Sequence, residues 1–194
     1  LISGKEPLSN EFITDAGERI QIPYTLLISA ISIIDDAAKA ITMDAKSPVN
    51  LLMLVGITRR ELGGSHYFAH RGVLGASVPV VDLQTGPATA RAVAALIRDQ
   101  FVASAHDLSE GGLAVSLAEM LFAGNLGAQL DLAGLPIAPD VTDDAAALFS
   151  ESPSRYLLEI PPEKFDAAAR ALLATPFGVL GRLTDSPTLT LRGL

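Results

Sequence analysis

A turn at residues 105–113 carries the side chains with the clearest potential for chemistry. It reads Ala-His-Asp-Leu-Ser-Glu-Gly-Gly-Leu, with Asp107 two positions before Ser109. A carboxylate and a hydroxyl at this spacing could hold a Mg²⁺ ion and a phosphate oxygen. Because the residues that follow favour a helix, the turn would also aim backbone N–H groups and a positive dipole end at a ligand. The turn is therefore a candidate phosphate site.

The same turn also fits a purely structural role. Asp107 and Glu110 have the spacing of a capping box, in which Asp107 is the N-cap and Glu110 reaches back to it. Gly111 and Gly112 would then only allow the helix to pack closely against a sheet. The two roles can coexist, so both interpretations stay open at this point.

Two regular elements must position the turn. The apolar residues 101–103 are typical of the end of a buried strand, and residues 113–122 combine helical spacing with strong helix formers. A strand that enters a glycine-containing turn and leaves as a helix is therefore predicted around Asp107.

The rest of the chain predicts an α/β sandwich with helices packed on a central sheet. Asp15–Glu18 is a hairpin-type turn, and the apolar run 26–34 is typical of a buried strand that Asp35 and Asp36 end. After a polar, irregular stretch at 37–50, strands and helices alternate. The expected strands are 51–56, 126–132, 155–160, 177–183 and 188–191, and the expected helices are 85–100, 113–123, 142–149 and 161–173.

A second polar group surrounds two adjacent glycines, Gly63 and Gly64. These glycines could bring the backbone close to a ligand or permit positive φ. His66 and His70 stand four residues apart, as two metal ligands on one helix face would. The neighbouring glycines argue against a helix, however, and no third ligand is evident, so a metal site is not expected there.

Composition excludes several classes of function. The 194 residues are 49% hydrophobic and 19% charged, as in a globular protein with a substantial core. A formal net charge of −8 argues against nucleic acid or an anionic membrane as the main partner. It does not exclude phosphate ligands, because helix N-termini and Mg²⁺ can bind them without a basic surface.

The absence of cysteine excludes disulfides and thiol catalysis within this chain. The sequence also has no apolar run of 18 residues, and its first residues lack the pattern of a signal peptide. We therefore expect a cytoplasmic protein.

Five segments, taken in order, resemble the phosphoribosylformylglycinamidine synthase family of purine biosynthesis. Each motif alone is moderately specific, but the five together span essentially the whole chain. They are Ser3–Phe12, Leu27–Asp35 with Ala40–Asp44, Glu61–Ser65, Ala105–Leu113 with Ala118–Met120, and Leu148–Glu151.

The resemblance implies a fold and an activity. Members are ATP-dependent carbon–nitrogen ligases that amidate formylglycinamide ribonucleotide with glutamine-derived ammonia through an iminophosphate. Their synthetase part has two related halves, each with a nucleotide-binding domain and a C-terminal α/β domain. By this comparison, residues 1–45 are the end of an AIR synthase N-terminal-like domain, and residues 46–194 are an AIR synthase C-terminal-like domain. The chain alone would be inactive, because the family's catalytic His and glutaminase Cys lie elsewhere.

The resemblance also implies roles for single residues. Asp107 matches a Mg²⁺ ligand and Ser109 a nucleotide contact, both in the auxiliary nucleotide site of the long-form enzymes. Gly4 matches a nucleotide-contacting glycine of the short forms, and Lys5 takes a position that is an Asn ligand of Mg²⁺ in short forms and Lys in long forms. Pro7 replaces a usual serine and so removes a hydroxyl and an N–H from a substrate-contacting position. The expected ligands are Mg²⁺ and ATP or ADP.

The implied partners are a small nucleotide substrate, the rest of the synthetase chain, and a glutaminase domain or subunit. Other interpretations stay open. The site could bind nucleotide for structural reasons alone, or the chain could belong to AIR synthetase, selenophosphate synthetase or thiamine phosphate kinase of the same superfamily. It could also be a plain interaction domain. A strand at 26–34 without sheet partners would favour homodimers of the isolated chain.

Overall fold

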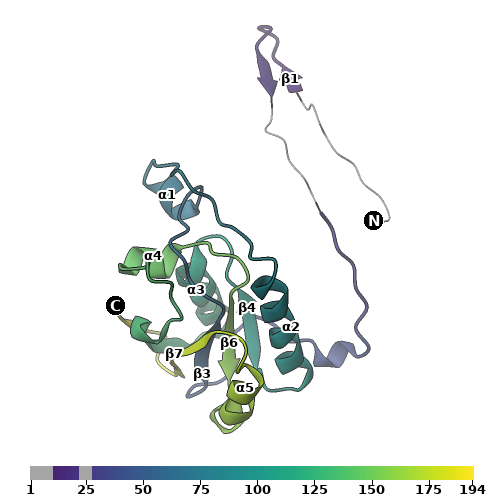
Figure 1. Ribbon diagram of the computed structural model, residues 1–194, viewed down its shortest axis with the longest axis vertical. Helices are drawn as coiled ribbons and strands as arrows, with labels where there is room; N and C mark the ends of the chain where they lie inside the picture. The colour runs from purple at the N-terminus through teal and green to yellow at the C-terminus, as the bar shows by residue number, and fades with distance from the viewer. Residues whose placement is uncertain (1–10, 22–27) are drawn as a thin grey trace. The chain divides into compact units, whose positions relative to one another are not determined.

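The computed structural model describes residues 11–21 and 28–194. Its chain divides into two compact units, Leu1–Ala37 and Ala38–Leu194. In the first unit, β1 (Glu11–Ile13) and β2 (Arg19–Gln21) form an antiparallel hairpin in which Phe12 lies opposite Ile20 (Figure 1). The hairpin turn predicted at 15–18 is confirmed.

The buried strand predicted at 26–34 is wrong over the part that the structure describes. Residues 26 and 27 lie outside the described residues, and residues 28–34 form no strand. Ile31 is 96% exposed and Ile33 is 92% exposed. An apolar run becomes a strand only when a neighbouring strand pairs its backbone N–H and C=O groups, and no described strand does so here. A short 3₁₀ turn, η1 (Ala37–Lys39), follows.

The second unit is built on a six-stranded sheet in the order β4-β6-β3-β7-β5-β8. All neighbouring strands are antiparallel except the parallel pair β5 and β8. β3 is a continuous apolar run, and β6 is apolar apart from Glu159, as expected for strands covered on both faces. The bounds are β3 Leu51–Val55, β4 Ser104–Asp107, β5 Gly127–Asp131, β6 Tyr156–Ile160, β7 Phe177–Thr184 and β8 Leu189–Arg192.

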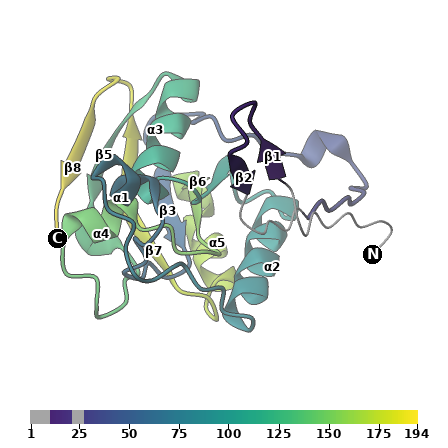
Figure 2. The same ribbon diagram turned by 90° about the horizontal axis from the view of Figure 1, so that it is seen from above.

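Helices cover both faces of this sheet and make two separate cores (Figures 1 and 2). Alternation along β3 sends Leu52 and Leu54 into the core beneath α3 and α4, and Met53 and Val55 into the core beneath α2 and α5. The predicted layered α/β sandwich is therefore confirmed. Its helices are α1 His66–His70, α2 Thr85–Arg98, α3 Gly112–Gly124, α4 Asp144–Phe149 and α5 Phe165–Ala171, with 3₁₀ turns η2 Leu132–Gly134 and η3 Pro162–Lys164.

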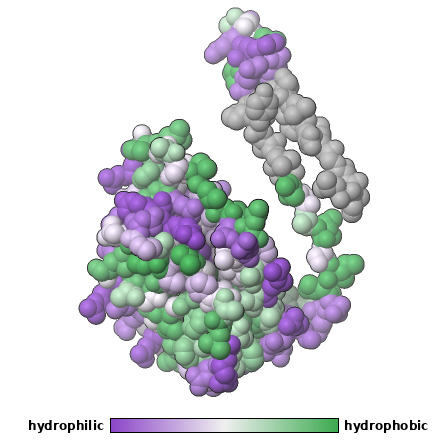
Figure 3. Space-filling model, viewed as in Figure 1, coloured by the Kyte–Doolittle hydropathy of each residue, from purple (hydrophilic) through white to green (hydrophobic). Residues whose placement is uncertain are grey.

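None of the helices in the described ranges has the length and apolar character needed to cross a bilayer. The segment between α1 and α2 does expose a row of apolar side chains, which Figure 3 shows as hydrophobic surface between these helices. They are Val73, Leu74, Val78, Val80, Val81 and Leu83.

Two local predictions need correction. The strand before the candidate turn is Ser104–Asp107 and not residues 101–103, because its register is set by pairing with β6. Residues 66–70 do form a helix, α1, whose first turn is capped when Ser65 Oγ accepts the Phe68 N–H. A Cβ added at Gly63 would lie 1.3 Å from the Ser77 carbonyl oxygen. The close backbone approach that Gly63 permits is therefore to residue Ser77 of the same chain, and not to a ligand.

A buried carboxylate fixes the edge strand that leads to the turn. Glu159 on β6 is fully buried, and its two oxygens accept four hydrogen bonds. Three donors come from residues 46–50, and the fourth is the hydroxyl of Ser104, the first residue of β4. Glu159 thus ties β4 and the segment before β3 to the centre of the sheet.

Candidate functional site

The candidate turn joins the end of β4 at Asp107 to the start of α3 at Gly112. The helix N-cap is Gly111, with φ +77°, which has no side chain of its own to cap the helix. The predicted capping box of Asp107 and Glu110 is therefore wrong. Asp107 stands too early in the chain to cap α3, because two successive positive-φ glycines extend the turn before the helix begins.

A carboxylate from elsewhere in the chain takes the place of the expected cap. Glu151 Oε1 accepts the backbone N–H of Gly111 and that of His66, both at 2.9 Å. The helix end therefore already holds an anion, which suits its positive dipole end. The expectation that N–H groups in this turn stay free is wrong for Gly111, and local sequence gave no signal for Glu151.

Asp107 is held at several points but stays accessible. One carboxylate oxygen accepts the Ser109 hydroxyl, and the other lies 3.3 Å from Nδ1 of His106. The carbonyl of Asp107 accepts the Ser116 hydroxyl at 2.9 Å. The hydrogen bond from Ser109 lowers the pKa of Asp107, with a smaller contribution from His106, so the carboxylate is ionised at neutral pH. The predicted pairing of Asp107 with Ser109 is present in the structure.

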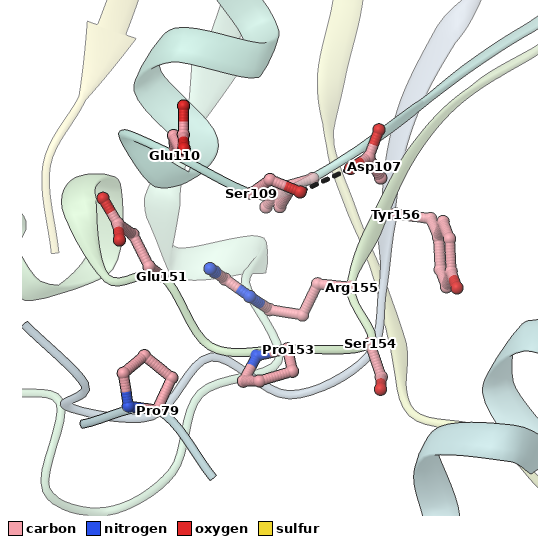
Figure 4. Close-up of a pocket in the computed structure, with 10 residues that line it drawn as sticks. Pro79, Asp107, Ser109, Glu110, Glu151, Pro153, Ser154, Arg155 and Tyr156 are labelled. Atoms are coloured by element: carbon pink, nitrogen blue, oxygen red, sulfur yellow. Dashed lines mark hydrogen bonds between the residues drawn. The ribbon is translucent and has the colours of Figure 1, made fainter. Parts of the chain in front are cut away.

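A cleft of about 410 Å³ opens beside this pair. Asp107, Glu110 and Glu151 contribute three carboxylates to it, and Arg155 is the only basic side chain among the described lining residues. Figure 4 shows Arg155, the residue just before β6, reaching between Ser109 and Pro153, with its guanidinium directed toward Glu151. The lining residues are Pro79, Asp107, Leu108, Ser109, Glu110, Glu151, Pro153, Ser154, Arg155 and Tyr156.

Arg155 is a fixed structural cation in the wall of the cleft. It is 1% exposed, and its guanidinium donates to the carbonyls of Ser150 and Ser152 and to the hydroxyl of Thr58. Burial lowers its pKa to about 10, against the opposing effect of Glu61 and Glu151, so it remains charged at neutral pH. Arg155 thus shapes the loop that carries Glu151.

A second cavity, of about 340 Å³, borders the same turn. Ser109 and Glu110 line both cavities. His66 lines this second cavity, but His70 does not. Within the described part of the chain, no three His, Cys, Asp or Glu side chains are grouped closely enough to hold a metal by themselves.

The remaining predicted site residues, Gly4 and Lys5, lie outside the described residues, as does Pro7. The structure therefore brings together Asp107 and Ser109 and leaves the other predicted contacts as predictions.

Comparison with known proteins identifies the domain. Residues 49–193 match the family described as AIR synthase related protein, C-terminal domain. The chain belongs to this family. The match covers the whole sheet and all five α-helices of the AIR synthase C-terminal domain. The predicted domain boundary between residues 45 and 46 stays a prediction.

Two similar curated sequences carry the same name. The chain is 36% identical over 173 residues to phosphoribosylformylglycinamidine synthase subunit PurL of Alkaliphilus metalliredigens, covering 89% of the chain and 22% of the relative. It is 34% identical over 197 residues to the same subunit of Beijerinckia indica, covering 98% of the chain and 25% of the relative. The predicted resemblance is confirmed, and the chain spans about a quarter of the length of these relatives.

Solved structures support the same fold. T. maritima PurL complexed with FGAR has a TM-score of 0.71 at 22% identity, covering 80% of this chain and 28% of that one. T. maritima PurL complexed with ATP has a TM-score of 0.63 at 20% identity, over 80% of this chain and 25% of that one. Thiamine-monophosphate kinase of Stenotrophomonas maltophilia has a TM-score of 0.57 at 20% identity, over 79% and 53%. At these identities the likeness establishes the fold and not the reaction.

Proposed function

We propose that this chain is the C-terminal α/β part of a phosphoribosylformylglycinamidine synthase half. In this role it binds Mg²⁺ and the phosphates of ATP or ADP at Asp107 and Ser109. The observation that carries the proposal is the ionised, accessible Asp107 beside the Ser109 hydroxyl at the mouth of a cleft. The whole synthase would perform the ATP-dependent amidation, with the rest of the synthetase chain and a glutaminase as partners.

The donor groups of the cleft suit Mg²⁺. This hard cation is usually bound through one or two carboxylates together with water and phosphate oxygens, and not by a cage of protein ligands. Asp107 fits the role of direct ligand, because its side chain is 63% exposed and its pKa is lowered. When bound, Mg²⁺ would offset the negative charge of the cleft and so admit phosphate.

The chain's own residues would orient the phosphates and carry out no nucleophilic step. Ser109 can turn its hydroxyl from Asp107 to a phosphate oxygen, since only one torsion separates the two positions. Glu151 and Arg155 keep the opposite wall in place through buried hydrogen bonds. We expect the isolated chain to lack ammonia-dependent ATPase activity, because it supplies only this half-site.

Calorimetric titration of the chain with Mg²⁺ and ADP tests the proposal. We expect binding by the wild type and a loss of about 10- to 100-fold in affinity for Asp107→Asn, the usual effect of removing a charge-assisted contact. The matched control is Asp99→Asn, which removes an exposed carboxylate at the end of α2. Equal affinity of Asp107→Asn and wild type, or no binding by the wild type, would overturn the proposal.

The same site could instead hold a nucleotide for structural reasons alone. Replacing Asp107 with Ala in a full-length synthase that carries this domain distinguishes this role from a catalytic one. Loss of turnover in a folded protein supports a catalytic site. Loss of bound nucleotide and of stability, with turnover per folded molecule unchanged, supports a nucleotide held for structural reasons.

A further inference from the structure

A single ionisable side chain stands out on the helix behind the candidate site. Residues 112–124 of α3 read Gly-Leu-Ala-Val-Ser-Leu-Ala-Glu-Met-Leu-Phe-Ala-Gly, so Glu119 is the helix's only charged residue. It lies on the exposed side of α3, where it lines the second cavity. Its Oε2 lies 2.9 Å from Nε2 of His106 on the neighbouring strand β4. The only charged side chain of α3 thus contacts the imidazole ring of His106.

That ring belongs to the residue just before Asp107. The His106 side chain is only 18% exposed, and its Nδ1 lies 3.3 Å from Asp107 Oδ1. This contact lacks hydrogen-bond alignment, and Nδ1 is buried with no hydrogen-bond partner. Nε2 therefore makes the better-formed bond, to Glu119. The geometry indicates that Glu119 sets the orientation of the His106 ring.

The ring in turn limits where the Asp107 carboxylate can lie. Ser109 holds one carboxylate oxygen and the His106 ring packs against the other. If the ring rotated away, one side of the carboxylate would lose its neighbour, and the side chain could take other rotamers. Groups behind a metal ligand commonly fix its orientation in this way, and their loss weakens metal affinity about 10- to 100-fold.

We propose that Glu119 and His106 are positioning residues that hold the Asp107 carboxylate in the orientation needed to bind a divalent cation. The inference rests on the proposed function of Asp107 and assigns the second cavity a part in it. The support for the cation site thus comes from α3, through a residue that lines the second cavity and not the cleft.

The pair Glu119→Ala and Glu119→Gln tests the inference. Gln can still accept a hydrogen bond from His106 Nε2–H, whereas Ala cannot. We expect Glu119→Ala to weaken binding of Mg²⁺ and ADP about 10- to 100-fold, and Glu119→Gln to stay within about threefold of the wild type. Glu163→Ala, an exposed substitution on η3, is the matched control. Thermal unfolding checks that each variant is folded.

A measurement without ligand keeps the inference separate from the proposed function. NMR of the ligand-free chain can follow the ¹³Cγ resonance of Asp107 and the ring ¹⁵N resonances of His106, one of only three histidines. We expect the Asp107 and His106 resonances to shift in Glu119→Ala and to stay near their wild-type positions in Glu119→Gln. An unmoved Asp107 resonance in Glu119→Ala would overturn the inference, as would equal effects of Ala and Gln. Absent binding by the wild type would overturn only the proposed function.

Discussion

Replacing Glu159 by Gln should destabilise the second unit by about 2–4 kcal/mol, because the buried carboxylate accepts four hydrogen bonds. An amide keeps one oxygen and presents an NH₂ group to the donors on its other side. If the NH₂ group faces the side of Lys46 and Ser104, the Ser104 hydroxyl can rotate to accept, but the Lys46 N–H cannot. One buried N–H without a partner costs about 1–3 kcal/mol, and weaker bonds to a neutral acceptor add the rest.

Glu159→Leu should be more severe, since all four donors lose their acceptor. The expected cost, about 4–8 kcal/mol, approaches the total stability of an ordinary domain. Urea denaturation followed by circular dichroism measures both variants, with the exposed substitution Glu163→Gln as the control. The reasoning fails if Glu159→Gln unfolds within about 0.5 kcal/mol of the wild type.

Three further results are expected. Ser109→Ala should raise the lowered pKa of Asp107, which a ¹³C NMR titration measures. In the wild type, the hydrogen-bonded Asp107 carboxylate stabilises the folded state at pH values above its ordinary pKa of 3.8, and this stabilisation is lost as the pH falls through the lowered pKa. Arg155→Met should lower the urea midpoint, because it leaves three acceptors without their donors; an unchanged midpoint would refute its structural role. The exposed isoleucines of residues 28–34 should promote self-association of the isolated chain, and Ile31→Asp with Ile33→Asp should reduce it in light scattering; a wild-type monomer at high concentration contradicts this.

Local sequence was sufficient for features whose partners are close in the chain. Asp107 and Ser109 stand two residues apart, and the turn and helix after them follow from two glycines and apolar periodicity, whereas the strand before them is Ser104–Asp107 and not the predicted 101–103. The central strand β3 and helix α2 were predicted within two residues, because long apolar patterns leave little choice of element.

Features that depend on distant partners were missed. Glu151 accepts the N–H of Gly111, the N-cap of α3, from 40 positions along the chain, and Arg155 donates to Thr58 across 97 positions. Neither pairing leaves a periodic signal in the sequence. The predicted strand at 26–34 failed for the same reason, since an apolar run indicates the capacity to be buried and not the presence of a partner strand.

The electrostatics of the cleft limits what it can bind. Asp107, Glu110 and Glu151 line the cleft, whereas the guanidinium of Arg155 is buried and already donates to two carbonyls of its own loop and to the Thr58 hydroxyl. A free phosphate would therefore meet negative charge and no exposed basic side chain among the described lining residues, and the N-terminus of α3 already bonds Glu151. Because like charges repel strongly where solvent is partly excluded, we expect phosphate to enter together with a cation. Asp107 has the exposure and ionisation to hold that cation, so the metal and the nucleotide should bind this domain as a unit.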